Sequence, residues 1–147
     1  MATDKPLNGL QTLYYDNGQK ELEAYYKDNK RVGKWTHWNE NGQIDLESHY
    51  KDDKVHGKWT EWYENGHKSE KNYKNDKKNG KSTEWYENGQ RMFDAYYKDG
   101  KLDGKWTQWL EDGQIDLEIN YKDGKQEGKT TYWDDDDNVI SYLEYKD

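Results

Sequence analysis

The stretch Gly57–Gly66 reads GKWTEWYENG, and it decides the fold because the chain repeats it. Close copies stand at Gly33–Gly42 (GKWTHWNENG), Gly80–Gly89 (GKSTEWYENG) and Gly104–Gly113 (GKWTQWLEDG), with weaker ones from Gly9 and Gly128. The leading glycines are 24 residues apart, with a single step of 23. Self-similarity at such a period indicates a tandem array. We divide residues 1–147, as one domain, into six repeats: 9–32, 33–56, 57–79, 80–103, 104–127 and 128–147.

The composition is unusual for a globular chain. Only 30% of the residues are hydrophobic and 37% are charged, yet the chain contains 8 Trp and 14 Tyr. Typical globular chains are roughly 45–50% apolar, so too few aliphatic residues are present for a conventional two-layer core. Disordered chains, in contrast, are poor in aromatic residues. The composition therefore favours a folded repeat array that is built on aromatic side chains.

The charge balance limits the class of partner. The chain has 23 Lys and Arg against 31 Asp and Glu, a formal net charge of −8, and no Cys. Nucleic acids require a basic surface, and anionic membranes also attract basic segments, so we expect neither as a main partner. No apolar segment approaches the length of a membrane span or a signal peptide core. We expect a soluble, cytoplasmic protein, with export as the alternative if a signal peptide was removed.

Two turn signals alternate along each repeat. The first is Asn-Gly or Asp-Gly, as at Asn41-Gly42, which tolerates the positive φ of a two-residue type I′ hairpin turn. The second lies in the phrase Tyr-Lys-Asp-x-Lys, as at Asp52-Asp53. The segments between them are rich in Trp, Tyr, Thr and Ile, which suit strands. The sequence thus predicts an all-β fold: a tandem β-hairpin repeat array forming a single elongated, twisted antiparallel sheet, a meander of about twelve strands.

The predicted register sorts the side chains onto two faces. The more apolar face is expected to bind a partner through Trp35, Leu46, Trp59, Trp106 and Leu117, with Ile44 and Ile115 beside them. The opposite face carries a ladder of tryptophans, with Asp45 and Asp116 between them: Trp38, Trp62, Trp85, Trp109 and Trp133. The ladder has two interpretations that stay open. Its rings cover the backbone, or they also serve as aromatic anchors that bind a partner, sugars or quaternary ammonium groups.

Repeat three breaks the spacing. Gly66 and Tyr73 are seven residues apart, whereas Gly42 and Tyr50 are eight apart. A slip of one residue moves side chains to the other face. We therefore predict a bulge, a kink or a loss of pairing within His67–Tyr73, and a bend of the sheet there.

Sequence motifs for catalysis are absent. There is no Gly-rich phosphate loop, no nucleophile elbow and no His pair at zinc spacing. The register pairs His49 with His56, and Asp134–Asp137 offers oxygen ligands of the kind that calcium takes, but solvated surface positions explain both better. We expect no enzyme, no catalytic residues, no cofactor and no metal site.

The phrase YKDDKVHGKW at Tyr50–Trp59, followed by WYENG, resembles the MORN repeat in its bacterial variant form, and Tyr97–Trp106 matches equally well. The resemblance implies tandem hairpins and a non-catalytic scaffold or binding module. Many bacterial members are antitoxin or immunity-type proteins, so it implies a protein partner, with a toxin as one candidate and a second copy of the chain as another. A weaker similarity to choline-binding and glucan-binding wall repeats gives the alternative function, carbohydrate or choline binding through the Trp/Tyr ladder. Phospholipid-headgroup binding, the other alternative, is implied only by the resemblance to MORN proteins.

Overall fold

A computed structural model describes residues 4–145, except for the side chain of Tyr142, and forms one antiparallel sheet. Twelve long strands make six hairpins: β1 (Gly9–Tyr14), β2 (Lys20–Lys27), β4 (Gly33–Trp38), β5 (Ile44–Lys51), β7 (Gly57–Trp62), β8 (Lys68–Lys74), β10 (Gly80–Trp85), β11 (Arg91–Lys98), β13 (Gly104–Trp109), β14 (Ile115–Lys122), β16 (Gly128–Trp133) and β17 (Val139–Tyr145). Five two-residue strands join them: β3 (Lys30–Arg31), β6 (Lys54–Val55), β9 (Lys77–Lys78), β12 (Lys101–Leu102) and β15 (Lys125–Gln126).

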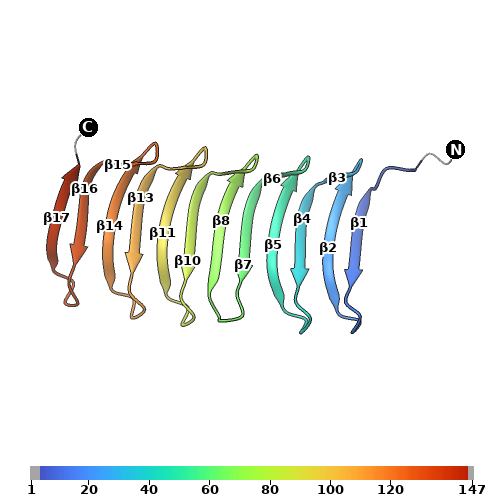
Figure 1. Ribbon diagram of the computed structural model, residues 1–147, viewed down its shortest axis with the longest axis horizontal. Helices are drawn as coiled ribbons and strands as arrows, with labels where there is room; N and C mark the ends of the chain where they lie inside the picture. Colours follow the sequence, from blue (N-terminus) through green and yellow to red (C-terminus); the bar gives the residue numbers. More distant parts are fainter. Residues whose placement is uncertain (1–3, 146–147) are drawn as a thin grey trace.

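The strands lie side by side in sequence order from β1 to β17, in one open layer (Figure 1). This confirms the predicted all-β array of hairpins, and the five short strands are additional to the twelve expected. No helix within residues 4–145 has the length and apolar character that crossing a membrane requires.

The two turns of a repeat differ in type, and the expected assignment was wrong. At the Asn-Gly turn the Gly42 N–H donates to the Asn39 carbonyl (3.0 Å), and the Asn39 N–H donates to the Gln43 carbonyl (2.8 Å). In this loop only Gly42 has a positive φ, 87°, which describes a type I turn followed by a glycine bulge. The type I′ turn is the other one, where Asp52 and Asp53 have φ of 47° and 67°. Short polar side chains tolerate this left-handed conformation.

A bulge follows the Asn-Gly turn in every repeat except the third. His37 lies opposite Leu46 and Trp38 opposite Ile44, so Asp45 is an extra residue on β5. The hairpins β1–β2, β10–β11, β13–β14 and β16–β17 have the same shift. In repeat three the pairing between β7 and β8 runs without interruption to Trp62 and Lys68. The prediction of an irregularity at His67–Tyr73 is therefore wrong, because the missing residue is the bulge residue itself.

The bulge also exchanges two predicted face assignments. Asp45 lies on the side of His37, with 2.6 Å between a carboxylate oxygen and the imidazole Nδ1. Ile44, paired with Trp38, lies on the opposite side. Repeat five has the same arrangement, because Asp116 accepts a hydrogen bond from Gln108 while Ile115 pairs with Trp109. The two isoleucines therefore lie on the face of the Trp ladder, and the two aspartates lie on the other face. Between repeats, Leu46 lies opposite Glu61, two residues from Trp59 on β7, so the two faces continue from one repeat to the next.

The interior of this one-layer sheet consists of small side chains. Ala24 and Ala95 are fully buried, and Ser48 is 1% exposed. A row of threonines is buried on the opposite face: Thr36, Thr60, Thr83, Thr107 and Thr131. Larger side chains close over these rows from neighbouring positions. Exposed large apolar side chains concentrate instead on the outer strands β1 and β17, namely Leu10, Leu13, Tyr14, Val139, Ile140, Leu143 and Tyr145.

The glycines that begin the hairpins have a positive φ, which other residues rarely adopt, and at Gly104 a neighbouring side chain also lies close to the position of a Cβ. The φ of Gly104 is +119°, and an added Cβ would lie 3.1 Å from the Cβ of Tyr96. We expect Gly104→Ala to lower the free energy of unfolding by roughly 1–3 kcal/mol, measured by urea denaturation followed by Trp fluorescence. Gly89→Ala is the control, because φ is +85° there but no atom lies within 4 Å of the new Cβ. Equal losses for both variants would show that the contact with Tyr96 adds nothing.

Candidate functional site

The first candidate surface, the tryptophan face, is the face that carries the ladder residues Trp38, Trp62, Trp85, Trp109 and Trp133. All five are half-buried. The protein supplies its own cations to these rings: Lys20 Nζ lies 5.6 Å from the Trp38 ring centre, Lys68 Nζ 4.7 Å from that of Trp85, and the Arg91 guanidinium 4.4 Å from that of Trp109. A choline group would have to compete with these contacts, so the geometry favours the role of the ladder in covering the sheet.

Rows of ion pairs complete the tryptophan face. In repeats two to five, the lysine that follows the leading glycine reaches a carboxylate on the next strand: Lys34–Glu47 (2.9 Å), Lys58–Glu70 (3.1 Å), Lys81–Asp94 (3.3 Å) and Lys105–Glu118 (2.8 Å). These partly exposed pairs each contribute only tenths of a kcal/mol. Their regularity leaves this face electrically balanced along its length.

The second surface, the tyrosine face, carries Tyr26, Tyr50, Tyr73, Tyr97 and Tyr121, and it includes all five residues of the predicted partner-binding face. Those residues, Trp35, Leu46, Trp59, Trp106 and Leu117, are all half-buried. Trp35 lies between the rings of Tyr26 and Tyr50, at centroid distances of 5.6 and 5.2 Å. Burial raises the pKa of Tyr73 and of Tyr97. These aromatic side chains therefore pack mainly on one another.

The two long edges of the sheet differ in charge, which the sequence analysis missed. We call the Asn-Gly turns, at the bottom of Figure 1, the acidic edge: residues 15–19, 39–43, 63–67, 86–90, 110–114 and 134–138. They contain ten carboxylates and no Lys or Arg: Asp16, Glu40, Glu64, Glu87, Glu111, Asp112 and Asp134–Asp137. The opposite edge, the lysine edge, has turns 27–30, 51–54, 74–77, 98–101 and 122–125, each flanked by two lysines. The alternation of turn phrases was the signal that could have revealed this.

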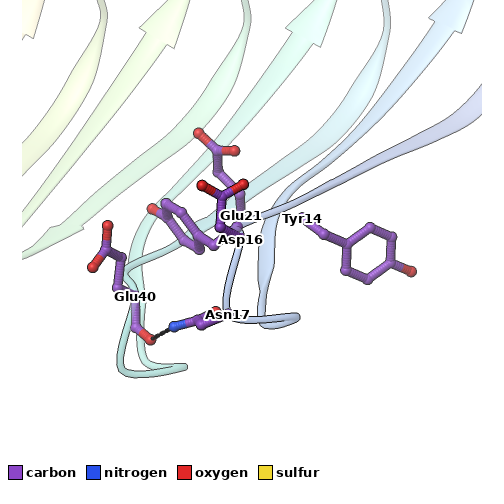
Figure 2. Close-up of a pocket in the computed structure, with 6 residues that line it drawn as sticks. Tyr14, Asp16, Asn17, Glu21 and Glu40 are labelled. Atoms are coloured by element: carbon purple, nitrogen blue, oxygen red, sulfur yellow. Dashed lines mark hydrogen bonds between the residues drawn. The ribbon is translucent and has the colours of Figure 1, made fainter.

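Hollows lie along the acidic edge. One of about 340 Å³ is lined by Tyr14, Tyr15, Asp16, Asn17, Glu21 and Glu40. Figure 2 shows that Asp16, Glu21 and Glu40 all belong to this hollow, whereas the Tyr14 ring points away from them. A second hollow of about 380 Å³ repeats the arrangement around Tyr86, Asn88 and Glu111. A third, of about 730 Å³, lies between repeats two and three. The edge therefore combines carboxylates with aromatic walls.

Tyrosines join successive turns of the acidic edge. The Tyr15 hydroxyl donates to the Trp38 carbonyl (2.7 Å), and the Tyr86 hydroxyl donates to the Trp109 carbonyl (2.8 Å). Beside them, the Asn17 and Asn88 amides donate to the carbonyls of Glu40 (3.0 Å) and Glu111 (2.6 Å). We call each such Tyr hydrogen bond to the next repeat a staple. Sequence reasoning missed the staples, although a Tyr before Asp/Glu-Asn-Gly recurs in repeats one, three and four.

The two metal sites considered from the sequence have other interactions. The His49 ring nitrogen Nδ1 lies 2.9 Å from the Lys58 carbonyl, and His49 and His56 are joined through their backbones. The Asp134 carboxylate accepts the N–H groups of Asn138 and Asp136, which lowers its pKa despite an opposing effect of desolvation. Within residues 4–145 no three His, Asp or Glu side chains form a group that could hold a metal ion.

The Tyr86 staple provides a test of the joined turns. We expect Tyr86→Phe to lower the free energy of unfolding by about 1 kcal/mol, because it leaves the Trp109 carbonyl without this donor. Urea denaturation measures the loss. Tyr132→Phe, on an exposed strand position, is the control and should change stability by less than about 0.5 kcal/mol. A Tyr86→Phe variant as stable as the parent would contradict a structural role of the staple.

Tyr63 is the exception in repeat three, and it predicts a pH dependence. Its hydroxyl donates to Glu61 (2.9 Å), and this hydrogen bond raises its pKa from 10.0 to about 12. Because the folded pKa lies above the unfolded one, the stabilisation is complete below pH 10 and is lost as the pH rises through about 12. Glu61→Gln should lower the pKa of Tyr63, measured by tyrosinate absorbance with Tyr63→Phe as the reference. An unchanged titration would exclude Glu61 as the cause.

Comparison with known families matches the periodic part of the fold. The model of the MORN repeat variant matches residues 7–28, 31–52, 55–75, 78–99 and 102–123. Each matched segment contains one hairpin, from before its first long strand to the first of the two central residues of the I′ turn. A search of curated proteins found no match. Since the matched segments make up well over half of the sequence, the chain belongs to the MORN repeat variant family.

Proposed function

We propose that this chain is a non-catalytic protein-binding module that recognises a basic partner protein through its acidic edge. MORN repeats suggest a repeat module for binding or scaffolding. The observation that carries the choice of surface is the difference in charge between the edges: ten carboxylates without Lys or Arg occupy the turns of one edge, whereas ten lysines and six aspartates occupy the turns of the other. Complementary charge speeds the encounter of two proteins and selects partners.

The form of the edge supports a macromolecular partner. The turns follow one another along the length of the sheet (Figure 1), so their carboxylates form an extended row. The tryptophan and tyrosine faces, in contrast, are covered by their own cations and rings. The hollows of the acidic edge add aromatic walls to the carboxylates, and aromatic side chains anchor protein interfaces. We propose a basic bacterial toxin as the partner class, which the resemblance to antitoxin and immunity-type members favours.

The experiment removes charge from one edge at a time. The test variant carries Glu40→Gln, Glu64→Gln, Glu87→Gln and Glu111→Gln, which keep the side-chain shape. The control carries Asp28→Asn, Asp52→Asn, Asp99→Asn and Asp123→Asn, which change the net charge equally on the lysine edge. Asn tolerates the positive φ of these positions. Parent and variants are immobilised and exposed to an extract of the native organism, and captured proteins are identified by mass spectrometry.

We expect the parent and the control to retain a basic protein that salt elutes, because screening weakens contacts between exposed charges. The purified partner should bind the test variant at least about tenfold more weakly than the parent, a difference of 1.4 kcal/mol. Equal binding to all three proteins, or specific capture only of acidic proteins, would refute the proposed surface.

A further inference from the structure

Among the described residues, no Tyr staple spans the gap between the turns 39–43 and 63–67, and the gaps after repeats three and five also lack one. In repeats one and four the gap to the next turn is spanned by the staples of Tyr15 and Tyr86. The corresponding residue of repeat two is Asn39, whose side chain is too short to reach the Trp62 carbonyl as a tyrosine does. The gap between repeats two and three therefore lacks the ring that Tyr15 and Tyr86 place in the gaps after repeats one and four.

The turn of repeat three also leans away from this gap. A Cβ added at Gly66 would lie 3.0 Å from the Glu87 Cγ and 3.6 Å from the Glu87 Cα, so this turn approaches the backbone of repeat four. The His67 ring meets the Tyr86 ring edge-on at 6.5 Å. The loop between β7 and β8, which lacks the bulge residue, is visibly wider than the other loops of its edge (Figure 1). Both changes open a groove of about 730 Å³ on the side of repeat two.

The groove combines apolar, aromatic and acidic walls. Ile44, Trp62 and Tyr63 supply the first two, and Ile44 and Tyr63 are 36% and 47% exposed. Asp45 and Glu64 supply carboxylates, and the remaining lining residues are Asn39, Asn41, Gln43, Gly66 and His67. No Lys or Arg is among these lining residues.

On the tryptophan face, Lys68 already lies over the Trp62 wall of the groove. Lys68 Nζ lies 4.7 Å from the Trp85 ring centre and 5.8 Å from that of Trp62, so it is nearer to repeat four. The Asp45 carboxylate contacts His37 at 2.6 Å and remains 34% exposed. The groups of the lining that an incoming cation finds exposed are the ring of Tyr63 and the carboxylate of Glu64.

We propose that this groove binds an arginine side chain of the basic partner. A guanidinium stacks on aromatic rings and stays protonated at ordinary pH. Its planar group can also donate two parallel hydrogen bonds to one carboxylate. The ammonium of a lysine offers neither the plane nor the fork. The volume lies within the roughly 300–1,000 Å³ of sites that enclose small ligands. This inference rests on the proposed function, because it assigns to the acidic edge the position of one anchoring residue.

The test fills the groove without altering charge. In Asn39→Tyr the new hydroxyl should donate to the Trp62 carbonyl, as Tyr15 does to Trp38, so the variant is expected to be at least as stable as the parent in urea. Leu110→Tyr is the matched control, because Leu110 holds the same repeat position as Asn39 but lies three repeats away. Octa-arginine and octa-lysine peptides are titrated into each protein at physiological salt, with binding followed by calorimetry and Trp fluorescence.

We expect octa-arginine to bind the parent and Leu110→Tyr alike, and to bind Asn39→Tyr at least about tenfold more weakly, a difference of 1.4 kcal/mol. Octa-lysine should bind the parent several-fold more weakly than octa-arginine. If octa-arginine binds the parent and Asn39→Tyr equally, the groove is not the arginine site. In that case the acidic edge is still supported as the binding surface if the four Glu→Gln changes abolish binding. Equal affinity of the two peptides for the parent also overturns the assignment to arginine. If neither peptide binds the parent, the groove and the basic partner both fail.

Discussion

A sheet of one layer must shield its own backbone, and most features of this molecule follow from that constraint. No second layer covers the central rows, so the side chains at their middle are small, such as Ala24, Ser48 and Thr36, and nearly inaccessible. Larger neighbours close over them, as Trp35 does between Tyr26 and Tyr50. The hydrophobic effect acts on the area removed from water, and here aromatic rings and the stems of lysines remove that area in place of an aliphatic core.

The same constraint explains why the repeats are so similar. Several of the residues that cover a row belong to the neighbouring repeat, as Arg91 does for Trp109 and Lys68 for Trp85. A repeat therefore has the neighbours it needs only if the adjacent repeat presents the same positions in the same register. The outer strands β1 and β17 have a neighbour on one side only, which is why exposed Leu10, Leu13, Ile140 and Leu143 gather there.

The edges are free of this constraint, and they are where the repeats diverge. The Asn-Gly turns need a glycine and an i to i+3 hydrogen bond, but the side chains beside the glycine point to solvent or to the next turn. Tyr15, Asn39, Tyr63 and Leu110 occupy one equivalent position with different contacts. A recognition surface can use such a position, because the side chain can differ between repeats while the turn and the sheet stay the same.

The sequence by itself determined the period, the strands and the single antiparallel sheet. Glycines at a fixed spacing and two turn phrases per repeat leave few alternatives. The Trp ladder was also placed on one face correctly, since strand side chains alternate with a period of two.

Only the tertiary structure decided where the bulges, staples and grooves lie. A bulge inserts one residue into a strand, so Ile44 and Asp45 each lie on the face that was predicted for the other. No local sequence signal at Asp45 marks the bulge. The type I′ turn was predicted at the wrong phrase because both phrases tolerate positive φ. Which phrase adopts it depends on the pairing of the flanking strands. The groove between repeats two and three arises from contacts that are 20 or more residues apart, such as Gly66 with Glu87. The sequence shows that Asn39 replaces a tyrosine, whereas the space which that replacement leaves open exists only once the turns lie side by side.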